Sequence, residues 1–354
     1  MAEAAVMGWD IGGAHVKACL SVQGQVQDVV QWPCPLWQGL HHLQAVLDQA
    51  QARWPQRPTL QHVVTMTGEM TDLFADRRAG VVAITAHLAQ ALGDGLRLFA
   101  GPEHWLAPAE ASAHWAQIAS ANWLATAHHA AQHAGQGVLL DIGSTTTDLI
   151  AFDNGQVRLQ GRSDAGRLAS GELVYHGVVR TPLCALGPRV PWRGQTLNVM
   201  NEFFATSADL YRLLGQLSAA HDQHPAADNG AKTEAATCIR LARMIGLDAA
   251  DGTLADWRAL AAHWCAAQVA EIAGQLRRVL AAQPLRPGAR VVSAGCGDFL
   301  VPAVLAAAGV QAPVLRYGHA VARLSPQAPA DTAEWAQVAA PAVAVAQLWH
   351  ASRH

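Results

Sequence analysis

Lysine is almost absent from this chain. Of its 24 basic residues only Lys17 and Lys232 are lysines, and all the others are arginines. Because the sequence uses arginine nearly everywhere else, the two retained lysines predict positions that need a compact ammonium group. The alternative is that the two lysines survived by chance, and the sequence leaves it open.

Other absences narrow the class of protein. No stretch approaches the ~20 uncharged apolar residues that a membrane span needs, and residues 1–6 lack the basic region and apolar core of a secretion signal. The net charge of −3 gives no electrostatic reason for a nucleic acid or an anionic membrane as partner. The six cysteines include no Cys-x-x-Cys pair, which predicts reduced thiols rather than disulfides or a metal site. We therefore expect a cytoplasmic protein that binds neither nucleic acid nor membrane.

Residues 137–150 carry the most informative pattern that is present. A short apolar run ends at Asp141, and a second apolar run begins after Asp148. Between the two runs lie a glycine and a set of hydroxyl residues, namely Gly143, Ser144, Thr145, Thr146 and Thr147. Apolar runs that flank such a turn predict a β-hairpin, and consecutive turn amides can bind an anion such as phosphate. Asp141 would then hold a metal ion or its water, whereas the alternative is an ordinary polar hairpin.

The same pattern stands near the N-terminus. Asp10 precedes Gly12 and Gly13, and an apolar run follows Lys17. Two phosphate-type hairpins in one chain of 354 residues favour two halves that fold toward one shared cleft. A third glycine-rich segment follows residues 291–294 and contains Gly295 and Gly297. In this order, the three segments resemble the phosphate motifs of the sugar kinase, heat-shock ATPase and actin superfamily.

A polar cluster follows another predicted strand. Residues 63–66 predict a buried strand that runs into Glu69 and Asp72. Polar residues at the carboxyl end of a strand in an α/β sheet are typical of a ligand cleft. The start of a capped helix explains the same residues equally well. Further along, residues 118–133 predict one long helix that leads to the second hairpin, and residues 256–282 predict another long helix.

Four segments between the hairpins narrow the resemblance to a family. They are residues 65–69, residues 121–125, residues 171–175 together with Arg180-Thr181-Pro182, and residues 201–206. They resemble the hydantoinase/oxoprolinase-related proteins of tetrahydromethanopterin-linked one-carbon transfer, and the resemblance extends from Gly8 to about Leu348. It implies an α/β, two-domain actin-like (ribonuclease H-like) ATPase fold with a central cleft. We expect residues 1–134 and 135–331 to form the two domains, and a C-terminal helix, residues 332–352, to pack back on the first.

The family resemblance also implies a reaction. Its named enzyme is a methanofuran-type synthase, a transferase that joins an aminomethyl-furanmethanol diphosphate to the phenol of a tyrosine- or tyramine-type acceptor, which is glutamylated, and releases diphosphate. The protein must then neutralise the departing diphosphate and remove the proton of a phenol whose pKa is near ~10.

The resemblance implies the following roles in that reaction. Lys17 and Arg180 supply positive charge, Glu69 is the candidate base, and Mg²⁺ is bridged by Asp10 or Asp141. The expected diphosphate-binding residues are Gly12, Gly13, Gly143, Ser144, Thr145, Thr146, Lys232, Gly295 and Gly297.

Two other functions stay open at this point. The superfamily motifs equally suit an ATP-dependent small-molecule kinase or a hydantoinase/oxoprolinase-type hydrolase, which would bind ATP or ADP. A non-catalytic nucleotide sensor is the second alternative. Ala14 and His15 stand in the first hairpin where the superfamily usually has threonine, which disfavours nucleotide phosphotransfer. A homodimer is compatible with the sequence.

Overall fold

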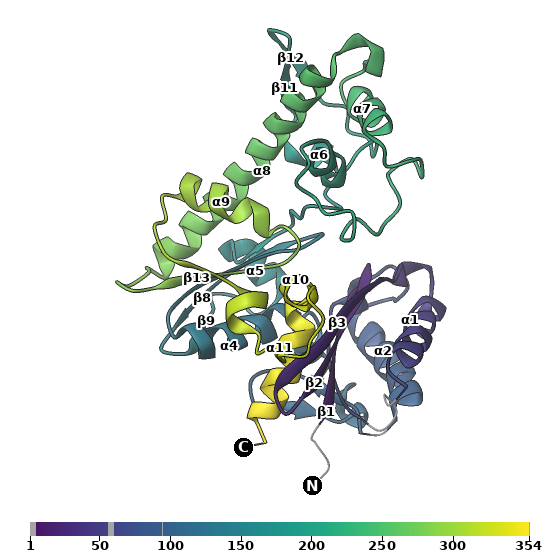
Figure 1. Cartoon of the computed structure of the whole chain (residues 1–354), viewed down its shortest axis with the longest axis vertical. Helices are drawn as coiled ribbons and strands as arrows, with labels where there is room; N and C mark the ends of the chain where they lie inside the picture. Colours follow the sequence, from purple (N-terminus) through teal and green to yellow (C-terminus); the bar gives the residue numbers. More distant parts are fainter. Residues whose placement is uncertain (1–4, 56–59, 94, 354) are drawn as a thin grey trace. The chain divides into compact units, whose positions relative to one another are not determined.

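The computed structural model of the chain describes residues 5–55, 60–93 and 95–353 (Figure 1). The chain forms two compact units. Unit 1 contains residues 1–137, 152–158 and 314–354, and unit 2 contains residues 138–151 and 159–313. No helix among the described residues is long and apolar enough to cross a membrane.

Unit 1 is built on a six-stranded sheet with the order β3-β2-β1-β4-β5-β6. Its strands are β1 (Ala5–Ile11), β2 (His15–Val22), β3 (Gln25–Pro33), β4 (Gln61–Met66), β5 (Arg97–Phe99) and β6 (Trp105–Leu106). Its helices include α1 (Leu40–Arg53), α2 (Arg77–Leu92), α3 (Trp115–Ile118), α4 (Asn122–Ala134), α10 (Thr332–Val338) and α11 (Ala340–Ala351). β1 pairs antiparallel with β2 and parallel with β4, so the first predicted hairpin is confirmed.

The two faces of this sheet are covered by different helices (Figure 1). Met7, Trp9 and Ile11 alternate along β1 and pack into one core with residues of α1 and α2. The opposite face carries Gly8, where a side chain would overlap the Ala342 carbonyl of α11. The missing side chain therefore lets the C-terminal helix lie directly on the central strand, and the next residue on this face is Asp10.

The second sheet has the order β10-β8-β7-β13-β14, with β9 paired to β8. Most of β7 and β8, together with β10 and β13, belongs to unit 2, whereas the residues of β9 and β14 belong to unit 1. The strands are β7 (Gly137–Ile142), β8 (Thr147–Asp153), β9 (Gln156–Arg158), β10 (Leu173–Val174), β13 (Arg290–Ala294) and β14 (Val314–Arg316), and a separate hairpin joins β11 (Arg189–Trp192) to β12 (Gln195–Asn198). Helices of this part are α5 (Asp164–Ser170), α6 (Ser207–Leu213), α7 (Glu234–Arg243), α8 (Leu254–Ala282) and α9 (Val301–Ala308). The predicted helix 256–282 is confirmed as α8.

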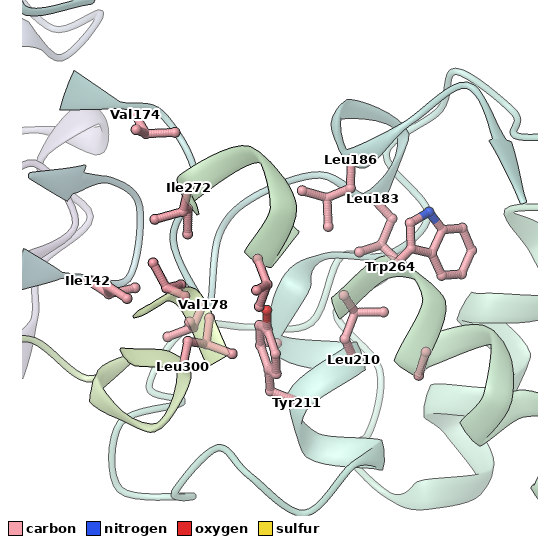
Figure 2. Close-up of a cluster of buried hydrophobic side chains, with 14 of the residues drawn as sticks. Ile142, Val174, Val178, Leu183, Leu186, Leu210, Tyr211, Trp264, Ile272 and Leu300 are labelled. Carbon is pink, nitrogen blue, oxygen red and sulfur yellow. The ribbon is translucent and has the colours of Figure 1, made fainter. Parts of the chain in front are cut away.

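A single apolar core joins the long helix α8 to the strand β7. Figure 2 shows Ile142, Val178 and Leu300 close together, with Tyr211 between them and Leu210. Ile142 is the last residue of β7, so this core anchors the strand directly below the turn that follows it. The second hairpin is thereby held by buried side chains from several segments of unit 2.

Candidate functional site

The first hairpin places an ion pair at the carboxyl end of β1. Asp10 on β1 lies opposite Lys17 on β2, and Lys17 Nζ donates to Asp10 Oδ2 at 3.3 Å. Asp10 is 2% exposed, whereas 21% of the Lys17 side chain reaches solvent. The turn between them closes with a 3.0 Å bond from Gly12 N to His15 O, and a Cβ at Gly12 would lie 2.7 Å from that same oxygen. The turn therefore needs glycine at position 12, and it aligns the two charges.

The negative charge of the Asp10 carboxylate is only partly balanced by its surroundings. Among the described residues, no hydrogen-bond partner is found for Asp10 Oδ1. Burial raises the pKa of Asp10 above its ordinary value, against the lowering effects of Lys17 and Asn122. A buried carboxylate whose charge is incompletely balanced is a suitable ligand for a cation.

We expect Asp10→Asn to stabilise the protein near neutral pH. Because the pKa of Asp10 is raised in the folded state, its carboxyl favours folding at low pH and opposes folding once the pH exceeds the folded-state pKa. The amide removes this cost, so the Tm of the variant should exceed that of the parent at neutral pH. The gain should shrink as the pH falls toward about 4. Thermal unfolding over a pH series checks this, and a gain that does not depend on pH would contradict it.

Glu69 lies beside the first turn. It belongs to a short 3-10 helix, Gly68–Met70, directly after β4. The segment that contains Glu69 is hydrogen-bonded to the first hairpin, because Thr67 N donates to Ile11 O at 2.9 Å. A Cβ at Gly13 would lie only 2.7 Å from Thr71 Cγ2. Direct contacts within unit 1 therefore place residues 67–72 beside the first hairpin. That these residues line a ligand cleft stays a prediction.

The approach of residues 120–122 to this cluster could not be predicted from the sequence. The predicted helix over residues 118–133 is wrong in one respect, because α3 ends at Ile118 and α4 begins at Asn122. The break contains Ser120 at a φ of 50°. Its hydroxyl donates to the buried Glu69 Oε1 at 2.8 Å. Asn122, the first residue of α4, lowers the pKa of Asp10, so the interruption of the helix brings two polar residues to the two carboxylates.

The second hairpin repeats the backbone geometry of the first with different charges. Gly143 N donates to Thr146 O at 2.8 Å, and this closure places Asp148 opposite Asp141 in the antiparallel register. Asp148 thus occupies the position that Lys17 has in the first hairpin. Its carboxylate accepts a hydrogen bond from Arg167 of α5, which is 1% exposed. Here the positive charge comes from a separate helix, and no motif in the sequence signals it.

The two glycines of the third segment press against the end of β7. A Cβ at Gly295 would overlap the Ile142 carbonyl and lie 2.7 Å from Asp141 Oδ1. Gly297 N donates to Ile142 O at 2.8 Å. Gly295 and Gly297 therefore lie against the end of β7, beside the carboxylate of Asp141. Their role in diphosphate binding stays a prediction.

A further loop, residues 177–181, lies on the second turn, and we call it the Arg180 loop. The amides of Val179 and Arg180 both donate to Ser144 O, at 3.1 and 2.9 Å. Gly177 approaches the turn so closely that a Cβ there would overlap the backbone of Ser144 and Thr145. Burial lowers the pKa of Arg180, and nearby Tyr175 opposes this effect. The loop therefore brings the backbone of Arg180, whose guanidinium is partly buried, to the predicted phosphate turn.

Lys232 has different surroundings. Its ammonium group donates to the Asp222 carboxylate at 2.9 Å and to the Asp222 carbonyl at 2.5 Å. Asp222 also pairs with Arg212, and Arg212 with the buried Asp209. This network of ion pairs gives a structural reason for a lysine at position 232, and the role in diphosphate binding stays a prediction.

A comparison with models of protein families shows which family the chain belongs to. Residues 61–334 match the model of the hydantoinase/oxoprolinase family, which is more than half of the chain. The chain belongs to this family. The matched residues include Glu69, the second turn, the Arg180 loop and the third glycine segment, whereas the first hairpin precedes the match.

Two relatives of this hydantoinase/oxoprolinase-family protein carry the same name, (4-{4-[2-(gamma-L-glutamylamino)ethyl]phenoxymethyl}furan-2-yl)methanamine synthase. The protein from Methanocaldococcus jannaschii is 28% identical over 246 residues, which cover 69% of this chain and 72% of that protein. The protein from Methanococcus vannielii is 36% identical over 81 residues, which cover 23% of this chain and 36% of that protein.

A solved structure supports the fold. The nucleotide-free structure of acetone carboxylase matches with a TM-score of 0.52 and 10% identity, over 84% of this chain and 66% of that chain. At this identity the likeness concerns the fold alone. The predicted α/β fold is confirmed.

Proposed function

We propose that this protein is a transferase of methanofuran-type coenzyme biosynthesis. It would join an aminomethyl-furanmethanol diphosphate to the phenol of a tyrosine- or tyramine-type acceptor, and release diphosphate. The observation that carries the proposal is the 28% identity to the Methanocaldococcus jannaschii synthase over 69% of this chain. The name of that enzyme describes a furan joined through a phenoxymethyl ether to a glutamylated aminoethyl chain.

The chemistry requires charge neutralisation, and each unit carries groups that suit it. The furan ring stabilises positive charge on its methylene carbon, so the carbon–oxygen bond to diphosphate can break early. Negative charge then grows on the diphosphate, and positive groups placed in advance lower the barrier. Unit 1 offers Lys17, which is partly exposed next to Asp10. Unit 2 offers Arg180 on the second turn.

The phenol must lose its proton as the new ether bond forms. Glu69 is buried and accepts a hydrogen bond from Ser120. A carboxylate whose direction is held by a hydroxyl can act as a base toward a phenol within hydrogen-bond distance. We assign Glu69 this role, with Ser120 fixing the direction of its carboxylate.

Mg²⁺ fits the residues of unit 1. Among the described residues, no group of three or more histidine, cysteine or acidic side chains forms a metal site by itself. Mg²⁺ is commonly held by one or two carboxylates together with water and phosphate oxygens, so a single carboxylate suffices. Asp10 Oδ1, buried and without a hydrogen-bond partner among the described residues, is the oxygen that would take it. The ion would supply charge to the departing diphosphate, and in unit 2 Asp141 is the corresponding candidate.

ATP-dependent ring opening is the second candidate function, and the family match favours it. A product assay separates the two. The protein is incubated with the furanmethyl diphosphate and tyrosine, tyramine or glutamyl-tyramine, with and without ATP. Ether product and diphosphate without ATP support the transferase. A lack of ether product with every acceptor, together with ATP hydrolysis, would contradict it.

We expect diphosphate with Mg²⁺ to protect the parent protein against thermal unfolding, since a ligand that binds only the folded state stabilises it. Asp141→Asn should weaken this protection, because the carboxylate next to Gly295 is lost with little change in shape. The measurement is the rise in Tm over a diphosphate series at fixed Mg²⁺. Asp153→Asn, on the same hairpin and half-buried, is the matched control. Equal protection in parent and Asp141→Asn would place the metal elsewhere.

A further inference from the structure

We propose that Gln268 and Tyr211 are positioning residues that hold the Arg180 loop on the second turn. Through this loop they would set the affinity for diphosphate. The ligand in this inference rests on the proposed function, whereas the contacts between the residues do not.

The two side chains form a buried chain of hydrogen bonds that ends on the loop. Tyr211 Oη donates to Gln268 Oε1 at 2.7 Å, and Gln268 Nε2 donates to Gly177 O at 3.0 Å. Both residues are 0% exposed. Gln268 lies in the middle of α8 and Tyr211 in α6, so two helices reach the loop through one glutamine.

A fully buried glutamine requires a specific reason. Burying an amide without partners is unfavourable, and an apolar residue would pack at the same place on α8 without that cost. Gln268 uses both ends of its amide, one as acceptor and one as donor. Burial raises the pKa of Tyr211, so its hydroxyl stays protonated and keeps donating over the whole working range of pH. The direction of the chain is therefore fixed: the tyrosine orients the amide, and the amide holds the Gly177 carbonyl.

Within the Arg180 loop, Gly177 is the residue whose position most directly affects the contact with the second turn. It contacts the backbone of the second turn, and its own backbone is bonded by Thr181 Oγ1 at 2.8 and 3.0 Å. The amides that bond to Ser144 O follow two and three residues later. A shift of the Gly177 carbonyl would therefore move the backbone of Arg180 and the turn together. α6 reinforces the arrangement, because Ser207 N donates to Thr181 O at 2.8 Å.

The test compares Gln268→Met and Tyr211→Phe with the parent. Methionine keeps the length of the side chain and removes both hydrogen bonds, and phenylalanine removes only the first link. We expect Gln268→Met to weaken binding of inorganic diphosphate with Mg²⁺ by roughly tenfold, and Tyr211→Phe by less. The double variant should be no weaker than Gln268→Met alone, because both substitutions break one chain. Isothermal calorimetry measures the affinities.

Hydrogen exchange provides a readout without ligand. Amides of residues 177–181 should exchange faster in Gln268→Met than in the parent. The control is Trp257→Phe, which removes a different hydrogen bond of α8, from Trp257 Nε1 to the Ala249 carbonyl. The control should lower Tm and leave both the diphosphate affinity and the exchange of the loop unchanged.

The outcomes separate the inference from the proposed function. If the parent binds diphosphate and both variants bind it within about twofold of the parent, the positioning role is wrong. If the parent does not bind diphosphate, the proposed function is contradicted. The amide hydrogen exchange of residues 177–181 then tests by itself whether Gln268 holds the Arg180 loop. Unchanged exchange in Gln268→Met then overturns the inference as well.

Discussion

Lys17→Ala is expected to lower kcat of the proposed transfer by on the order of 10²–10³, with a smaller effect on KM. The ammonium group lies at the end of the first hairpin, opposite Asp10 and partly exposed. From this position it would meet negative charge that grows on the diphosphate as the carbon–oxygen bond breaks. An interaction that strengthens toward the transition state affects kcat when it is removed, rather than KM alone.

Lys17→Arg should not restore full activity, although it keeps the charge. The guanidinium is larger and forked, and it would pair with Asp10 through two nitrogen atoms where lysine uses one. Lys17 Nζ meets the Asp10 carboxylate through a single contact of 3.3 Å. A surface role for Lys17 predicts nearly normal turnover in both variants. Arg53→Ala, which breaks the Arg53–Asp28 pair in the same unit, is the matched control for loss of a cation.

The hairpins could be predicted from the sequence because their determinants are local. The turn glycine, the alternation of apolar residues and the carboxylate all lie within a few residues of one another, and the pairing of Asp10 with Lys17 follows from the turn. The position of Glu69 next to the first turn follows from a parallel strand, β4, beside β1. These features depend on backbone hydrogen bonds that repeat in every sheet.

The remaining contacts depend on packing between distant segments. Gln268 and Gly177 are 91 residues apart, and no local pattern marks a glutamine on a long helix as a partner of a loop. The same holds for Arg167, which brings charge to Asp148 from a neighbouring helix. Ser120 breaks a helix that periodicity alone predicts to be continuous, and the break is stabilised by its bond to Glu69. In each case side-chain contacts decide the local conformation, and propensity is only a weak guide to them.

Gly295→Ala is expected to be the most damaging substitution in unit 2. Gly295 has a φ of +87°, which L side chains rarely adopt. Its Cβ would also overlap the Ile142 carbonyl and approach Asp141 Oδ1 to 2.7 Å. The Ile142 carbonyl belongs to the backbone at the end of a buried central strand and cannot move without the sheet. Strain and overlap together should cost on the order of 4 kcal/mol of unfolding free energy and abolish binding of diphosphate with Mg²⁺.

Two other glycines of unit 2 separate the cost of backbone strain from the cost of overlap with neighbouring atoms. Gly309 has a φ of +71° at the end of α9 with open space around it, so Gly309→Ala should cost only about 1 kcal/mol of backbone strain. Gly297 has an ordinary φ of −95°, and its Cβ would meet the side chains of Ile142 and Val178. Those side chains can shift, so the loss of unfolding free energy in Gly297→Ala should lie between the losses in Gly309→Ala and Gly295→Ala. Urea unfolding and diphosphate calorimetry measure the series, and equal costs at Gly295 and Gly309 would mean that contact with β7 does not constrain the third segment.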